Sequence, residues 1–350
     1  EAGGFKRESA ACYNYIGNIC SMKEKADSAF LMYEKALQIA HAIKDTATIG
    51  AVYNSLGIQY KNKGEYVKAI ESYNQSLKAA KDLHDEAGIG RCLANIASVY
   101  QFQGYYVKAL EYYFKSLELL EKNANLVNMT KTYANIGSVY YYQKDFPKSI
   151  EYFSKALDIE TGMKNSHGVA TLLNHIGNCY FELKEFPKAL DYFTKALAID
   201  KEKEYKREEA KVLGNLSRLN LQTGETSKAI DYANQALVIN REINDVQGVA
   251  VSQDELGAAF LSAGNYRKAI SHFQQSLKIA EEIGSAVEIR NASKGLYESY
   301  KKTGNSNLAL TIWLVLSLSG TVRLMTSLEE KRSSIRTKVT PTNASRSGWR

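Results

Sequence analysis

Residues 54–70, which read NSLGIQYKNKGEYVKAI, contain the pattern that decides the fold. This pattern recurs along nearly the whole chain with a fixed period of 40 residues and without insertions. Stepping by 40 from Gly57 reaches mostly small residues: Gly17, Ala97, Gly137, Gly177, Ser217, Gly257 and Tyr297. Stepping in the same way from Ala69 reaches Ala29, Ala109, Ser149, Ala189, Ala229, Ala269 and Ala309. A fixed period of a few tens of residues indicates a solenoid built from stacked repeats.

The spacing of apolar residues predicts two helices in each repeat. Tyr53, Leu56, Gly57 and Tyr60 stand at i, i+3, i+4 and i+7, which places them on one stripe of a helix. Gly64 is expected to end this helix, because glycine adopts a left-handed conformation without steric cost. A second stripe follows at Tyr66, Ala69, Ile70, Tyr73, Leu77 and Ala80. Each repeat is thus predicted to be an antiparallel helix pair whose core is completed only by stacking, so the fold class is all-α.

The order of these residues resembles the tetratricopeptide repeat family: a small residue, an aromatic, a turn glycine, then aromatic, alanine and aromatic. The resemblance covers about residues 10 to 310 and implies a right-handed superhelical solenoid of about eight antiparallel helix pairs. The period of 40 exceeds the usual period of about 34 residues. It resembles the longer-repeat subgroup of cell-polarity adaptors, bacterial aspartate-phosphatase regulators and bacterial sensor kinases. We expect the additional residues to lengthen the helix ends and the joints between repeats, as at residues 243–248.

The repeat pattern predicts a division of the chain near residue 310. Residues 1–310 are expected to form one array of eight repeats, the last incomplete, followed by a separate segment over residues 311–350. That segment begins with an apolar run, residues 311–320, which is too short to span a bilayer. Its interpretation stays open between a helix docked on the last repeat, a partner-binding patch and a non-native end, and the abrupt loss of the repeat favours the last. The basic Ser/Thr-rich tail is expected to be disordered.

The sixth repeat departs furthest from the pattern, since Asn220, Thr226 and Ala233 replace three aromatics. Sequence drift and a functional hinge both explain this change, and drift is favoured. Either explanation predicts the fastest hydrogen exchange among the internal repeats at residues 213–240.

The net charge of +7 is concentrated at one end of the chain. Residues 311–350 hold seven Lys or Arg and two Asp or Glu, hence +5, which leaves only +2 for the first 310 residues. This balance argues against a nucleic-acid partner. The cysteines lie on predicted first helices and are expected to be small core or near-core residues: Cys12, Cys20, Cys92 and Cys179.

The chain begins with neither an initiator Met nor a signal peptide, which suggests a fragment or a processed product. A cytoplasmic location is expected, and the alternative is the periplasmic part of a membrane-anchored sensor.

Motifs of catalysis are not found in the sequence. Residues 88–90 begin like a dinucleotide-binding fingerprint, but Leu93 stands where the third glycine belongs. The five histidines show no metal-ligand spacing. We therefore expect no enzyme activity, no catalytic residues, no metal and no cofactor.

In the family that the sequence resembles, the first helices line a concave surface that commonly takes peptides. The residues expected to bind a peptide there are Arg91, Asn95, Ser98, Phe102, Lys131, Asn135, Tyr142, Asn174, His175, Asn178, Lys211, Asn215 and Arg218. Asn offers a donor and an acceptor to a peptide backbone, cations favour an acidic segment or a terminal carboxylate, and aromatics hold apolar anchors. The usual carboxylate-clamp pattern of the family is not reproduced in full. The alternative is that the Asn side chains pad the stack by hydrogen-bonding between helices, but the recurring cations and aromatics favour binding.

The leading hypothesis is a non-enzymatic scaffold that holds a protein or peptide, with an acidic segment favoured, in the concave groove. Neither nucleic acid nor direct membrane contact by the array is expected. The alternative is a sensory or regulatory segment of a larger bacterial signalling protein, such as a histidine kinase or a cyclase.

Overall fold

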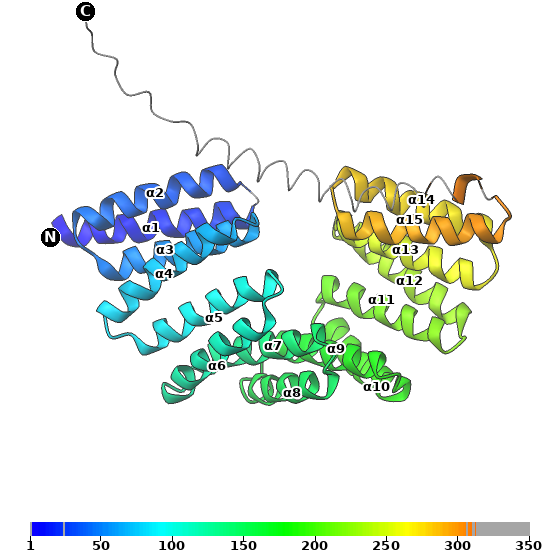
Figure 1. The fold of residues 1–350 in the computed structure, drawn as a ribbon, viewed down its shortest axis with the longest axis horizontal. Coiled ribbons are helices and arrows are strands. Elements are labelled where there is room, and N and C mark those ends of the chain that lie inside the picture. Colours follow the sequence, from blue (N-terminus) through cyan, green and yellow to red (C-terminus); the bar gives the residue numbers. More distant parts are fainter. Residues whose placement is uncertain (1, 24, 306, 310–311, 313–350) are drawn as a thin grey trace, which may run out of the picture. The chain divides into compact units, whose positions relative to one another are not determined.

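The computed structural model describes residues 2–23, 25–305, 307–309 and 312, and its elements are helices joined by short turns (Figure 1). Odd numbers mark the first helix of each pair and even numbers the second. The first helices are α1 (Ala2–Met22), α3 (Thr46–Asn62), α5 (Glu86–Phe102), α7 (Leu126–Tyr142), α9 (Ser166–Glu182), α11 (Lys206–Gln222), α13 (Val246–Ser262) and α15 (Ala286–Lys302). The second helices are α2 (Ala26–Ala42), α4 (Tyr66–Asp82), α6 (Tyr106–Lys122), α8 (Phe146–Gly162), α10 (Phe186–Glu202), α12 (Thr226–Glu242) and α14 (Tyr266–Glu282). The all-α fold class is confirmed.

The helices have a regularity finer than the repeat. From α2 to α15 each helix has 17 residues, and from α3 onward each begins 20 residues after the one before it. Three residues therefore join successive helices, both within pairs and between pairs. The expectation of a longer joint at residues 243–248 is wrong, because only 243–245 form the joint and Val246 already begins α13. The additional residues extend the helices, where each added N–H and C=O finds its partner inside the helix.

From α2 to α15, each helix ends in a turn that is closed by a residue with positive φ. After α3, Gly64 has a φ of +76°. The N–H of Glu65 donates to the carbonyl of Tyr60 at 2.8 Å, and the N–H of Gly64 donates to Lys61 at 3.0 Å. This bond pair satisfies carbonyls that the helix end leaves free. Lys144 closes the equivalent turn after α7 with a φ of +62°, so glycine is favoured there but not required.

Polar residues in the joints start many of the helices. The carboxylate of Asp45 accepts from the backbone N–H of Thr48 at 3.3 Å and so caps α3. Such caps satisfy N–H groups that have no partner within the helix. The same role is taken by Asp85, Asn125, Asp145, Asp245 and Asn265.

The chain divides into two compact units, with the boundary between Ile199 and Asp200. Within unit 1, the contacts between α1 and α9 run from each helix to the next, and the odd-numbered helices α1, α3, α5 and α7 also contact one another in order. Within unit 2, helices α11 to α15 do the same, and α13 contacts both α11 and α15. The prediction that one continuous array spans residues 1–310 stays a prediction.

The core of unit 1 contains one ring from each second helix. These rings are at most 2% exposed and belong to Tyr33, Tyr73, Tyr113, Phe153 and Phe193. Each lies against the small residue of the first helix in its pair. A Cβ built on Gly57 would lie only 2.5 Å from the Tyr73 ring, so the ring packs directly on the backbone of α3. This contact explains why the repeat needs a small residue there.

The core of unit 2 uses aliphatic side chains where unit 1 uses rings. Ala233 on α12 stands at the ring position and is fully buried, with Leu237 and Leu256 packed beside it. Phe273 on α14 restores the aromatic in the next pair. The polar side chain of Asn220 is also buried, and its Nδ2 donates to the carbonyl of Leu216 at 2.8 Å.

Some predictions about the sequence ends are corrected or untested. Cys92 and Cys179 are buried and Cys20 is half-buried, but Cys12 is exposed, because that side of α1 is not covered by a described helix. Apart from Ile312, the segment 311–350 lies outside the described residues. None of the described helices is both long and apolar enough to cross a bilayer.

Candidate functional site

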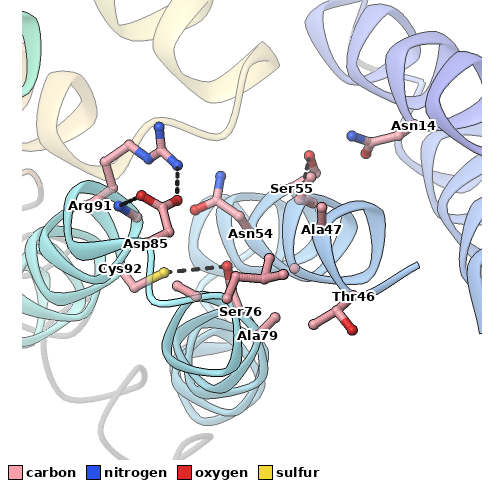
Figure 2. Close-up of a pocket in the computed structure, with 15 residues that line it drawn as sticks. Asn14, Thr46, Ala47, Asn54, Ser55, Ser76, Ala79, Asp85, Arg91 and Cys92 are labelled. Atoms are coloured by element: carbon pink, nitrogen blue, oxygen red, sulfur yellow. Dashed lines mark hydrogen bonds and ion pairs between the residues drawn. The ribbon is translucent and has the colours of Figure 1, made fainter. Parts of the chain in front are cut away.

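The side chains of interest lie on the odd-numbered helices, on the surface that the core stripe leaves open. We call this surface of α1 to α9 the first-helix face of unit 1. This face contains a pocket of 430 Å³ between α1, α3 and α5, with α4 as its floor (Figure 2). Its lining residues are Asn14, Thr46, Ala47, Gly50, Ala51, Asn54, Ser55, Ser76, Ala79, Ala80, Leu83, Asp85, Gly88, Arg91 and Cys92.

Two asparagines line the pocket, and a third on the next first helix bonds to one of them. Asn95 on α5 donates through Nδ2 to Oδ1 of Asn54 on α3, at 2.7 Å. Asn54 accepts this bond, so its own Nδ2 remains a donor. Across the pocket, Oδ1 of Asn14 on α1 is buried and has no hydrogen-bond partner among the described residues (Figure 2). A buried amide oxygen without a partner is uncommon. Because this oxygen exposes no surface, a ligand in the pocket would meet the Nδ2 group of Asn14 and not its oxygen (Figure 2).

Arg91 provides the positive charge at the pocket. Its Nη2 lies 3.5 Å from a carboxylate oxygen of Asp85, whose other oxygen accepts from the Gly88 N–H at 2.8 Å and caps α5. Both side chains of this ion pair are about half exposed, so the attraction between them is weak. The guanidinium therefore keeps donors for a second carboxylate at little cost.

The thiol of Cys92 lies at the bottom of the pocket, and it is not activated. Its Sγ donates to Oγ of Ser76 at 3.3 Å. Burial raises the pKa of the Cys92 thiol, so the thiolate that a nucleophilic cysteine needs is disfavoured. The base of the pocket is accordingly a neutral surface of small side chains.

Beyond the pocket, Lys61 on α3 contacts two residues of α5 that were predicted to bind a peptide. Its ammonium is 3.5 Å from Oγ of Ser98 and 5.3 Å from the centre of the Phe102 ring. Burial lowers the pKa of Lys61. Ser98 is itself buried and donates to the Asn95 carbonyl at 2.8 Å, which makes it a structural contact within α5. Phe102 is 65% exposed and lies in the last turn of α5, away from the pocket.

The next first helix, α7, presents side chains that are less engaged. Lys131 is exposed and forms no ion pair within the described chain, and Asn135 is half-buried. Tyr142 is 61% exposed in the last turn of α7, where its ring stacks on Tyr106 with centres 6.2 Å apart. Lys131 and Asn135 are thus the predicted residues with the most freedom to meet a ligand.

On α9 the predicted residues contact other side chains or the backbone of the protein. The ring of His175 stacks on Phe153 with centres 5.1 Å apart and planes 15° apart. Asn178 donates through Nδ2 to the carbonyl of Asn174 at 3.1 Å. For Asn95 and Asn178 the side chains do bond within or between helices, as the padding alternative expects.

The three remaining predicted residues belong to unit 2. Lys211 lies 4.0 Å from Glu208, and Arg218 donates to Oδ1 of Asn215 at 3.4 Å. Near them, burial raises the pKa of Glu255 on α13 to about 8, and the Arg218 charge opposes that rise. This buried carboxyl was not among the predicted residues.

The polar residues that the prediction missed share one register. Asn14 and Asn54 stand three residues before the small residue of their repeats, whereas the predicted line of Asn95, Asn135 and Asn215 stands two before it. The 40-residue spacing of Asn14 and Asn54 was a visible signal. Asp85 carries no such signal, because a helix cap and a site residue look alike in sequence.

Comparison with known proteins gives one family match. The model of the Tetratricopeptide repeat matches residues 48–122, 128–202, 169–242 and 208–282. A search of curated proteins finds no match.

Similar folds are found among solved structures. Aspartyl phosphate phosphatase F from Bacillus subtilis is 15% identical with a TM-score of 0.65, over 82% of this chain and 74% of that one. A Rap protein complexed with competence and sporulation factor is 14% identical with a TM-score of 0.62, over 93% and 99%.

A third structure is a signal-transduction ATPase with a tetratricopeptide repeat sensor from Pyrococcus horikoshii. It is 17% identical with a TM-score of 0.66, over 92% of this chain and 49% of that one. At these identities the likenesses show a shared fold.

Proposed function

This chain belongs to the tetratricopeptide repeat family, and from that premise we infer that it is a protein-interaction scaffold without catalytic activity. Its first-helix face in unit 1 binds an extended peptide segment of a partner protein. The observation that carries this proposal is the pocket between α1, α3 and α5, where the amides of Asn14 and Asn54 and the guanidinium of Arg91 surround a floor of small side chains. Proteins of similar fold are interaction modules, and one was solved with a peptide factor bound.

The pocket fits one side chain and the adjoining backbone of a peptide. Its floor of Ala79, Ala80 and Cys92 accepts apolar groups, while the Nδ2 groups of Asn14 and Asn54 offer donors to the backbone. An extended chain presents N–H and C=O groups in alternation, so paired amides on neighbouring helices match it.

The exposed cations select the charge of the peptide that binds. Arg91 at the pocket and Lys131 on α7 stand on successive first helices, 40 residues apart in sequence. Both are exposed, and the single acid that meets Arg91 is about half exposed. A peptide with carboxylates beyond the residue in the pocket is therefore preferred over a basic one.

Selection of peptides from a random library on the full chain tests this function. Arg91→Glu combined with Lys131→Glu should lower the affinity for the selected peptides by about tenfold or more, because charge reversal turns attraction into repulsion. The matched control is Lys78→Glu, an exposed lysine on the second helix α4. Helical far-UV circular dichroism should stay unchanged in both. Equal binding by wild type and the double variant contradicts the assignment of the face.

A sensory role within a larger signalling protein is a second candidate. It is supported by the fold shared with a repeat sensor of which this chain covers 49%. Sequencing the gene on both sides of this coding segment tests it. A membrane span or catalytic domain in frame supports the role, and stop codons at both ends exclude it. A cytoplasmic location stays a prediction.

A further inference from the structure

The turns of unit 1 differ sharply between its two edges. Three windows of eight residues span turns within helix pairs: 61–68, 101–108 and 141–148. Windows at matching positions in the turns between pairs are 81–88, 121–128 and 161–168. The first set holds seven Phe or Tyr, six Lys and two acids, whereas the second holds no Phe, Tyr or Trp, three Lys and four acids. Aromatic side chains and positive charge are therefore concentrated in the within-pair turns, which we call the aromatic edge.

Much of this apolar surface is not used for folding. Half-buried Tyr106 and Phe146 begin second helices and pack inward. By contrast, Phe102, Tyr105 and Tyr142 are 65%, 61% and 61% exposed. Val67 and Val107 are 70% and 80% exposed. Apolar side chains gathered in one place on a surface indicate a contact with another molecule.

Contacts between side chains connect the aromatic edge across three repeats. The Lys61 ammonium on α3 reaches over Phe102 at the end of α5, at 5.3 Å. The ring of Tyr106 at the start of α6 lies parallel to Tyr142 at the end of α7, within 3°. The exposed side chains are thus fixed by neighbours on adjacent repeats, which lowers the entropy that a partner would have to remove.

The charge of the aromatic edge is only partly balanced. Lys68 pairs with Glu65 at 2.6 Å, and Lys148 pairs with Asp145 at 3.0 Å. The lysines that form no ion pair within the described chain are Lys61, Lys63, Lys108 and Lys144. Carboxylates of a partner would complement these four ammonium groups.

We propose that the aromatic edge binds an acidic segment of a partner protein that carries apolar side chains between its carboxylates. The four unbalanced lysines meet the carboxylates, and Phe102, Tyr105 and Tyr142 take the apolar side chains. A nucleic acid fits less well, because Val67 and Val107 are the most exposed members and aliphatic groups do not stack on bases. The aromatic edge is separate from the pocket, which none of its residues lines.

The probe is a labelled synthetic peptide in which Glu alternates with Leu and Phe, titrated against the full chain by fluorescence anisotropy. Lys144→Glu should weaken binding by about tenfold, and Phe102→Ser with Tyr142→Ser should do the same. Lys164→Glu is the matched control, because Lys164 is also exposed and also closes a turn, with a φ of +57° against +62° for Lys144. It lies on the opposite edge and should leave the affinity unchanged. Lys131→Glu, on the first-helix face, reports whether the peptide binds to that face instead.

Four results would overturn the proposal. The first is an equal loss of affinity in the Lys144 and Lys164 variants, which would indicate that binding depends only on the total charge of the chain. The second is equal binding of a peptide with Lys in place of Glu. The third is tighter binding of a thymidine oligonucleotide, competitive with the peptide. The fourth is a dimer in sedimentation that dissociates in the Phe102→Ser, Tyr142→Ser variant. A loss caused only by Lys131→Glu would assign the peptide to the first-helix face and leave the proposed function standing.

Discussion

The buried tyrosine hydroxyls of the ring position are satisfied in one repeat and not in another. Oη of Tyr73 is buried and has no hydrogen-bond partner among the described residues. Oη of Tyr113, one repeat later, donates to Gln101 at 2.8 Å. Phe153 and Phe193 occupy the same position without a hydroxyl.

Removing these hydroxyls should have opposite effects. Tyr73→Phe should raise the free energy of unfolding by about 1 kcal/mol, because a buried group without a partner is removed. Tyr113→Phe should lower it by about 0.5–1.5 kcal/mol, because a bond to Gln101 is lost. Urea unfolding of the full chain measures both. A loss of similar size in the two variants would contradict this account.

Glu255 should make the stability of unit 2 depend on pH. Burial raises its pKa from 4.5 to about 8, and burial together with Glu288 raises the pKa of the adjacent Asp254 to about 7. The folded state then holds a proton that the unfolded state releases above the ordinary pKa. Stability is therefore complete below about pH 4.5 and falls as the pH rises toward about pH 8.

Glu255→Gln should remove the part of this dependence that belongs to Glu255 and leave the part that belongs to Asp254. At about pH 8.5 the free energy of unfolding should be about 1–3 kcal/mol higher for the variant than for wild type. Near pH 4.5 the two values should be alike. Exchange of the α13 amides against pH reports the change locally. A stability of wild type that rises from pH 5 to pH 8 in this helix would contradict the assigned direction.

At the scale of the helix, the turn residue controls where each element stops. Within-pair turns carry glycine at positive φ in Gly64, Gly104, Gly224 and Gly264, but lysine at Lys144 and Lys184. A side chain with a Cβ is strained in this conformation.

Lys184→Gly should therefore stabilise the chain by about 0.5–1 kcal/mol, and Gly224→Lys should destabilise it by about as much. The φ values are +61° at Lys184 and +83° at Gly224. Thermal unfolding followed by circular dichroism provides the measurement. A lower midpoint for the glycine variant would mean that the lysine contributes more through its side chain than it loses in backbone strain.

The sequence was sufficient to predict the helix pairs and not their exact joints. The small residue at Gly57 and the ring at Tyr73 are packing partners, so their 40-residue spacing directly reflects contacts between helices. The joints could not be predicted, because residues 243–248 contain polar and apolar residues that suit a loop and a helix start equally. The finer period of 20 residues depends on turns closed at positive φ by Lys44, Lys164 and Glu204, residue types that do not signal such a conformation in sequence.

At the scale of the whole molecule, each of the two units has its own core, and unit 2 contains the repeat that departs from the pattern. We still expect the fastest exchange among internal repeats over residues 213–240, because Ala233 fills less space than the ring it replaces. Hydrogen exchange with mass spectrometry tests this. Equal protection from the second to the seventh repeat would contradict it.

The binding face was predictable only in part. Sequence placed Arg91, Asn95 and Lys131 on first helices, as the structure does. It could not show that the Asn95 amide donates to Asn54, or that His175 stacks on a buried ring, since both contacts depend on how repeats lie against each other. The pocket depends on small residues across three helices, α3, α4 and α5, and no single stretch of sequence encodes it.

The most direct test of the account fills the pocket. Ala51 is exposed on α3 and lines the pocket, whereas Ala42 is exposed at the end of α2 and does not. The measurement is the dissociation constant of a library-selected peptide for Ala51→Trp and Ala42→Trp, made in the full chain. The account predicts a loss of about tenfold or more for Ala51→Trp and no change for Ala42→Trp. Equal affinity in the two variants would show that the peptide does not use the pocket.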